Sequence, residues 1–131
     1  LKVIYEFLGQ RGVDWHLKMV DNLLLDGKKK EARAFLKIMR ESFPDEFQTL
    51  LAEGLLLTSE EDYQAAIQTI NHSSNIEPEA FRPFLEKSRV WLASGKKENA
   101  IAILKVAEGK VKTLKDLKQV KNIKQIMETT H

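Results

Sequence analysis

The sequence predicts an all-α protein built from stacked antiparallel helix pairs, and three observations lead to that prediction. Three alanines stand 34 residues apart, at Ala32, Ala66 and Ala100. The similar phrases PDEFQTLL and PEAFRPFL open at Pro44 and Pro78, which have the same offset (78 − 44 = 34). Strand signals are weak along the whole chain. A fixed period of this length indicates supersecondary units that stack on one another.

The first and third periods each read as a pair of helices. The apolar spacing predicts first helices at 13–25 and 81–93, and second helices at 28–40 and 96–108. The turns between them are DGKKK and SGKKE, which place Gly27 and Gly95 at the ends of the first helices. A residue in the left-handed conformation is common at this position, and glycine adopts that conformation without strain.

The second period repeats this pattern. One apolar stripe predicts its first helix and consists of Phe47, Leu50, Leu51, Gly54, Leu55 and Leu57. Ser59 is the expected N-cap of the second helix, which carries Tyr63 and Ile70 and is expected to end within residues 71–75. Pro44 and Pro78 are expected in the first turn of the helices that they open, where no backbone donor is lost.

The two ends of the chain predict further helices. Residues 1–12 read as the end of a preceding helix or repeat, which Gly9 or Gly12 ends, so a longer parent protein is an open alternative. At the other end, Thr113 and Asp116 have the spacing of a capping box. Residues 113–131 therefore predict a basic capping helix and tail, which covers the last exposed core of a repeat stack.

The residues resemble the tetratricopeptide repeat (TPR) family, whose 34-residue unit is a helix–turn–helix with the pattern W-x₂-L-G-x₂-Y…A-x₃-F…P. Residues 47–80 match it best, through Leu50, Gly54, Leu57, Ala66, Ile70 and Pro78. In the units at 13–46 and 81–112, His16 replaces the aromatic residue and Lys112 the final proline. The resemblance implies one domain over 1–131, a right-handed α-solenoid whose first helices line a concave face.

Composition places the chain among soluble globular domains. Apolar residues make up 43% and charged residues 31% of its 131 residues, and the formal net charge is +2. No apolar run approaches the roughly 18 residues that would span a bilayer. The lack of cysteine excludes disulfides and thiolate metal sites within this chain. The compartment is not fixed by these features; a cytoplasmic location is favoured, and a targeting segment before Leu1 is left open.

The sequence indicates no catalytic chemistry, no cofactor and no metal site. His16, His72 and His131 are scattered, without a recurring metal-binding spacing. The adjacent carboxylates at 60–62 suit the positive end of a helix dipole. No phosphate loop, dinucleotide fingerprint or nucleophile elbow occurs. Trp15 and Trp91 are open alternatives as ligand platforms. However, Trp91 stands at the aromatic packing position of the repeat, where a core residue is expected. The prediction is that the protein is not an enzyme.

The resemblance implies a protein-interaction module, an adaptor or scaffold, that binds a partner on the concave face. The matching first-helix positions are Leu17, Asp21, Leu51, Leu55, Leu85 and Arg89. Leu24 and Leu92 are expected to extend the apolar surface, and a polar rim is expected from Asp14, Asp21, Gln48, Arg82 and Arg89. Leu17, Leu51 and Leu85 recur every 34 residues and are expected to form an apolar ladder. Such a ladder suits an apolar peptide or an amphipathic helix. The lysine–asparagine pair of the family's carboxylate-binding variant is absent.

Two alternatives remain open at this point. The concave face is also suited to a second copy of the chain, which would make the protein a homo-oligomeric scaffold. From Lys110 to His131 there are six lysines against Asp116 and Glu128, a net of +4. This tail suits an anionic partner, which would be nucleic acid, acidic lipid or an acidic protein. However, the tail lacks the aromatic residues that stack on bases, so nucleic acid is the less favoured partner.

Overall fold

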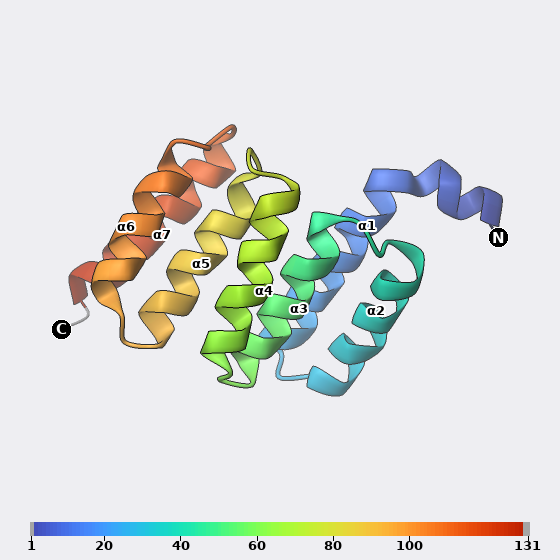
Figure 1. Cartoon of the computed structure of the whole chain (residues 1–131), viewed down its shortest axis with the longest axis horizontal. Coiled ribbons are helices and arrows are strands. Elements are labelled where there is room, and N and C mark those ends of the chain that lie inside the picture. The colour runs from blue at the N-terminus through green and yellow to red at the C-terminus, as the bar shows by residue number, and fades with distance from the viewer. Residues whose placement is uncertain (1, 130–131) are drawn as a thin grey trace. The chain divides into compact units, whose positions relative to one another are not determined.

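The computed structural model describes the backbone of residues 2–129 and the side chains of residues 12–129. Every regular element in this part of the chain is an α-helix, so the predicted all-α class is confirmed (Figure 1). The helices are α1 (Lys2–Leu25), α2 (Lys29–Ser42), α3 (Phe47–Ser59), α4 (Tyr63–Ile76), α5 (Phe81–Ala93), α6 (Lys97–Glu108) and α7 (Leu114–Thr129). None of these helices combines the length and apolar character that crossing a membrane requires.

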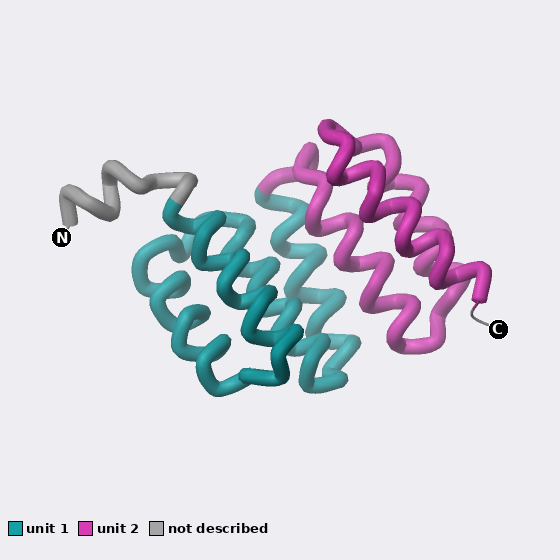
Figure 2. The backbone as a smooth tube through the Cα atoms, turned by 180° about the vertical axis from the view of Figure 1, so that it is seen from behind, with its two compact units in different colours: residues 1–76 teal, residues 77–131 magenta. Residues whose placement is uncertain are grey.

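The chain divides into two compact units, residues 1–76 and residues 77–131 (Figure 2). In the first unit, α1 packs against α2 and α3, α2 also contacts α3, and α3 packs against α4. In the second unit, α5 packs against α6, and α7 contacts both of them. The first unit thus holds the helix pairs of the first two predicted repeats, and the second unit holds the third pair with the C-terminal helix.

Small residues lie where paired helices approach closely. Ala32, Ala66 and Ala100 are buried, as expected for positions between the two helices of a repeat. The helices also approach closely at Gly54 of α3, where an added Cβ would lie 2.4 Å from Cγ1 of Ile70 in α4. The 34-residue recurrence of small side chains is therefore a packing requirement.

The second unit has one apolar core that joins its three helices. Its buried members are Phe81, Leu85, Ala100, Leu104, Ala107, Val120, Ile123 and Met127. The contributions of α7 lie at 120, 123 and 127, which is one stripe of a helix. At the start of α7, the backbone N–H of Asp116 donates to Thr113 Oγ1 at 3.1 Å, and the Asp116 carboxylate accepts from the N–H of Lys112. The predicted capping helix is thus confirmed, with Asp116 and Thr113 at its first turn.

The turns inside the helix pairs follow the predicted chemistry with one exception. Gly27 and Gly95 have φ of +75° and +83°, the left-handed values expected at helix ends. The equivalent residue of the middle pair is Glu61, with φ of +61°. An L-residue with a side chain is strained in this conformation by roughly 1–2 kcal/mol, so this turn is the strained member of the three.

Replacing Glu61 by glycine is expected to raise the free energy of unfolding by about 1 kcal/mol, because glycine adopts positive φ without strain. Urea unfolding followed by circular dichroism measures the change. Glu61→Ala is the matched control: it removes the same charge but keeps a Cβ, so it should leave the unfolding midpoint near that of the parent. An equal increase in the free energy of unfolding for both variants would attribute the effect to the lost charge, and would contradict backbone strain at Glu61.

Helix α4 differs from expectation at both ends. It continues through residues 71–75 to Ile76, because serine hydroxyls there donate to backbone carbonyls: Ser73 Oγ to Phe47 at 2.8 Å and Ser74 Oγ to Asn71 at 2.9 Å. Ser59 is the last residue of α3, where its hydroxyl donates to the Leu56 carbonyl, and it does not cap α4. The Asp62 carboxylate accepts from the N–H of Ala65 at 3.4 Å and takes the capping position.

The prolines and the first glycines also have different roles from those expected. Pro44 and Pro78 lie in turns before α3 and α5, closed by hydrogen bonds from Glu46 N–H to the Phe43 carbonyl and from Ala80 N–H to the Glu77 carbonyl. Each proline follows the carbonyl residue, the position where its fixed φ favours a turn. Helix α1 continues through Gly9 and Gly12 without ending. The side chains of residues 1–11, on which the predicted preceding repeat depends, lie outside the described ones.

Candidate functional site

The three leucines of the predicted ladder lie inside the fold. Leu17 is 7% exposed, and Leu51 and Leu85 have no exposed surface. Leu85 belongs to the apolar core of the second unit. Contact between a partner and these side chains would require the helices to separate. Of the other predicted residues, Gln48 is also buried. The partly exposed ones are Asp21, Leu24, Leu55, Arg82, Arg89 and Leu92.

The first unit presents α1 and α3 in the predicted 34-residue register. Gln48 Nε2 donates a hydrogen bond of 2.9 Å to Asp14 Oδ1, which joins two residues exactly one period apart (48 − 14 = 34). Asp21 and Leu55 are the next such pair, seven residues further along each helix. Both are half-buried, as is Leu24 one turn beyond Asp21. These residues form the first-helix face of the unit: Asp14, Asp21, Leu24, Gln48 and Leu55.

The side chain of Gln48 is an unusual part of this face. Gln48 is 3% exposed, and its Oε1 has no hydrogen-bond partner. A buried acceptor without a donor costs about 1–3 kcal/mol, so the amide oxygen favours any N–H or O–H group that reaches it. The sequence predicted Gln48 as a polar rim residue; the 34-residue pairing with Asp14 was the signal that could have indicated its inward position.

The second unit presents a charged triad along α5. The Glu86 carboxylate is buried and accepts from Arg82 Nε at 3.0 Å and from Arg89 Nη1 at 2.5 Å. Arg82 and Arg89, both predicted site residues, keep partly exposed guanidinium groups. Leu92 is half-buried and packs against the core of the unit. The triad carries a net charge of +1, so the exposed surface of these arginines favours an anionic group.

Helix α5 also contains a buried lysine that was not predicted as a site residue. Lys87 is 6% exposed, and its Nζ lies 4.3 Å from the ring centroid of Phe84. Lys110 Nζ lies 4.8 Å from the same ring. Burial, and then the charge of Lys110, lower the pKa of Lys87. The signal was present in the repeat pattern: Lys87 stands 34 residues after Glu53, at the position where the TPR pattern has leucine.

The two tryptophans have different environments. Trp91 packs against the core of the second unit, as expected for the aromatic position of the repeat. Trp15 is 53% exposed on α1, and its ring centroid lies 5.0 Å from that of His16 and 5.8 Å from that of Phe35. His16 Nδ1 donates to the Gly12 carbonyl at 2.6 Å, so its ring orientation is fixed. These rings form an aromatic cluster in the first unit.

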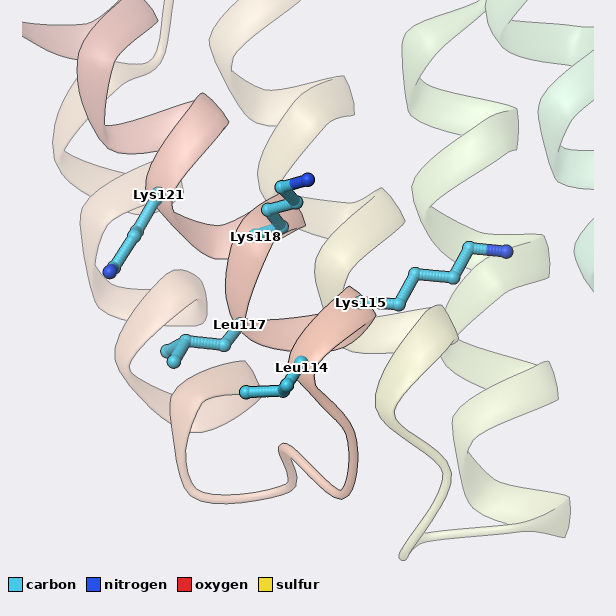
Figure 3. A pocket seen from close by; sticks show the side chains of 5 residues that line it. All are labelled: Leu114, Lys115, Leu117, Lys118 and Lys121. Carbon is cyan, nitrogen blue, oxygen red and sulfur yellow. The ribbon is translucent and has the colours of Figure 1, made fainter.

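The start of α7 lines a depression of the surface. A surface depression of about 530 Å³ is lined by five residues of this helix: Leu114, Lys115, Leu117, Lys118 and Lys121. Figure 3 shows Leu114, Leu117 and Lys121 extending to one side of the helix, whereas Lys115 extends to the other. We call these five residues the α7 surface.

Neither unit assembles a recognisable chemical centre from the described residues. No group of three or more histidine, cysteine, aspartate or glutamate side chains is arranged to hold a metal ion within residues 12–129. The ion pairs among these residues join arginine or lysine to glutamate, and several lie on the exposed surface. The candidate binding sites are therefore two surfaces, the first-helix positions and the α7 surface.

The paired helices and their 34-residue register define a TPR-like helical-repeat fold, which confirms the resemblance seen in the sequence. Solved structures share it. SycD, the type III secretion translocator chaperone of Yersinia enterocolitica, matches in an alternative dimer with a TM-score of 0.71 and 13% identity over 93% of both chains. SycD in complex with a peptide of the translocator YopD matches with a TM-score of 0.66 and 14% identity, over 93% of this chain and 96% of that chain.

A solved structure of a different complex has a similar fold. A chain of the Cut9–Hcn1 hetero-tetramer of the APC/C matches with a TM-score of 0.65 and 15% identity, over 84% of this chain and 24% of that chain. No protein-family model and no curated protein sequence matches. At these identities the likeness establishes the fold.

Proposed function

We propose that the chain is a non-catalytic protein-interaction module that binds an apolar peptide or an amphipathic helix of a partner protein through its first helices. The observation that carries the proposal is the likeness to SycD, whose structure includes a complex with a peptide of YopD. The likeness extends over nearly the whole of both chains. A fold alone does not define a function, so the proposal also depends on the accessible residues.

The first unit supports the proposal through its mixed apolar and acidic face. Leu24 and Leu55 expose part of their side chains on α1 and α3, and Asp14 and Asp21 supply carboxylates beside them. The buried leucines at 17 and 51 hold these helices in place. This arrangement suits a partner segment that buries apolar side chains and carries a basic residue or a free N–H donor.

The second unit favours acidic groups on a partner. Arg82 and Arg89 are held by Glu86 and keep exposed guanidinium surface, with Leu92 further along α5. Arginine side chains of this kind bind carboxylates through paired hydrogen bonds. We therefore expect a segment that binds the second unit to carry acidic residues beside Arg82 and Arg89 and an apolar residue beside Leu92.

The test uses peptides selected on the parent protein from a displayed random library, with affinities measured by calorimetry. Leu24→Glu/Leu55→Glu is expected to weaken binding by at least about tenfold, equivalent to about 1.4 kcal/mol, because it places carboxylates where apolar side chains would be buried. Ile38→Glu/Ile101→Glu is the matched control, since it changes two exposed isoleucines on the second helices α2 and α6. The control should retain the affinity of the parent.

Two results would contradict the proposal. Equal loss in both double variants would indicate non-specific adhesion of apolar peptides. A parent that elutes as a dimer by light scattering, and becomes a monomer only with Leu24→Glu/Leu55→Glu, would assign the first-helix face to self-association. The SycD structure in an alternative dimer makes this the relevant second measurement.

A further inference from the structure

Helix α7 has more apolar surface than its packing uses. Val120, Ile123 and Met127 are buried in the core of the second unit. Leu114 and Leu117 lie outside this stripe; Leu114 is 84% exposed and Leu117 is 40% exposed. Leu114 and the exposed part of Leu117 lie outside the core that α7 covers. Their position beside a surface depression indicates a separate role.

The exposed leucines continue directly into lysines. Leu114, Leu117, Lys118 and Lys121 follow the spacing i, i+3, i+4 and i+7, which places them along one stripe of the helix. All four line the depression of about 530 Å³ (Figure 3). The stripe is therefore apolar in its first turn and cationic in the next.

The positive charge of this stripe is uncompensated. Among the described residues, Lys115, Lys118 and Lys121 form no ion pair, whereas Lys124 pairs with Glu108 at 2.9 Å. The nearest carboxylate in sequence, that of Asp116, is bound to the N–H of Lys112. A ligand that brings its own carboxylates would thus meet lysines with no competing partner.

We propose that the α7 surface is a second binding site, distinct from the first helices, for an acidic amphipathic segment of a partner protein. Its apolar side chain packs against Leu114 and Leu117, and carboxylates one and two turns further on pair with Lys118 and Lys121. This is helix recognition with i, i+3, i+4 and i+7 contacts. A membrane-surface helix would need an apolar face several turns long, and α7 buries that part of its length against α5 and α6.

The test measures fluorescence anisotropy of a labelled 16-residue peptide that carries leucine and glutamate at this spacing. Lys118→Gln/Lys121→Gln and Leu114→Ser/Leu117→Ser are each expected to weaken binding about tenfold. Lys96→Gln/Lys105→Gln removes the same charge from exposed lysines elsewhere in the unit and should change affinity less than twofold. The Leu24→Glu/Leu55→Glu variant should bind this peptide as the parent does.

Three results would overturn the inference. A scrambled peptide of the same composition that binds equally well would reduce the site to general charge attraction. Equal loss in the Lys96→Gln/Lys105→Gln control would do the same. Tighter binding to vesicles rich in phosphatidylserine, or to single-stranded DNA, that is lost in Lys118→Gln/Lys121→Gln would assign the surface to lipid or nucleic acid. Circular dichroism of each variant verifies that all are folded.

Discussion

Leu85→Glu is expected to lower the free energy of unfolding by at least about 4 kcal/mol. The Leu85 side chain has no exposed surface and lies in the core of the second unit. A glutamate there must either be protonated or draw water into the core, and both are costly. Folded domains are stable by only about 5–15 kcal/mol. In a urea titration, the unfolding midpoint of this variant should therefore move far toward zero urea, and part of the variant should already be unfolded without urea.

Leu114→Glu is the matched control for this prediction. The same chemical change at a side chain that is 84% exposed should alter stability by no more than about 0.5 kcal/mol. A Leu85→Glu variant with the unfolding midpoint of the parent would show that Leu85 is accessible, as the apolar ladder required. Glutamate variants of Leu51 or Leu85 therefore cannot test partner binding, because loss of the fold would imitate loss of the site.

Gly54→Ala should destabilise the protein by about 2 kcal/mol, although alanine is the better helix former. Alanine gains up to about 1 kcal/mol over glycine within a helix. The added Cβ, however, would lie 2.4 Å from Cγ1 and 2.9 Å from Cδ1 of Ile70, so α3 and α4 must move apart. Overpacking of this kind costs about 1–3 kcal/mol or more. Thermal and urea unfolding measure the net change.

A double-mutant cycle separates the clash from other effects of the substitution. In the background Ile70→Ala, which removes both contacting atoms, Gly54→Ala should become neutral or stabilising. Gly109→Ala serves as the control glycine, since its φ of −68° suits any residue and its nearest contact is 3.4 Å from Val106 O. Equal costs of Gly54→Ala in both backgrounds would mean that Ile70 is not the obstacle.

The period and the turn chemistry could be predicted from the sequence because each depends on local constraints. Ala32, Ala66 and Ala100 are buried where the 34-residue spacing placed them, and Gly27 and Gly95 have the expected left-handed φ. The extension of α4 could not be predicted in this way. Serine is neutral to poor in helices by propensity, yet Ser73 is held there by a hydrogen bond to Phe47, 26 residues away in sequence.

The candidate site was harder to predict than the fold. A leucine at helical spacing marks an apolar side of a helix, but the sequence does not say whether a neighbouring helix covers it. At Leu51 and Leu85 the cover is complete. The reverse applies to Leu114, an apolar residue of the packed helix α7 that is 84% exposed. Both outcomes depend on which helices become neighbours, and that is settled by tertiary packing.

The ion pairs of Glu86 lower the entropic cost of binding a partner at α5. Holding a free arginine in one rotamer on binding costs about 0.5–1.5 kcal/mol. Arg82 and Arg89 already have their guanidinium groups held by one buried carboxylate, so much of this entropy has been lost during folding. A partner carboxylate would then meet a rigid, preorganised pair of donors. Specificity at α5 would thus depend on a residue, Glu86, that the partner never touches.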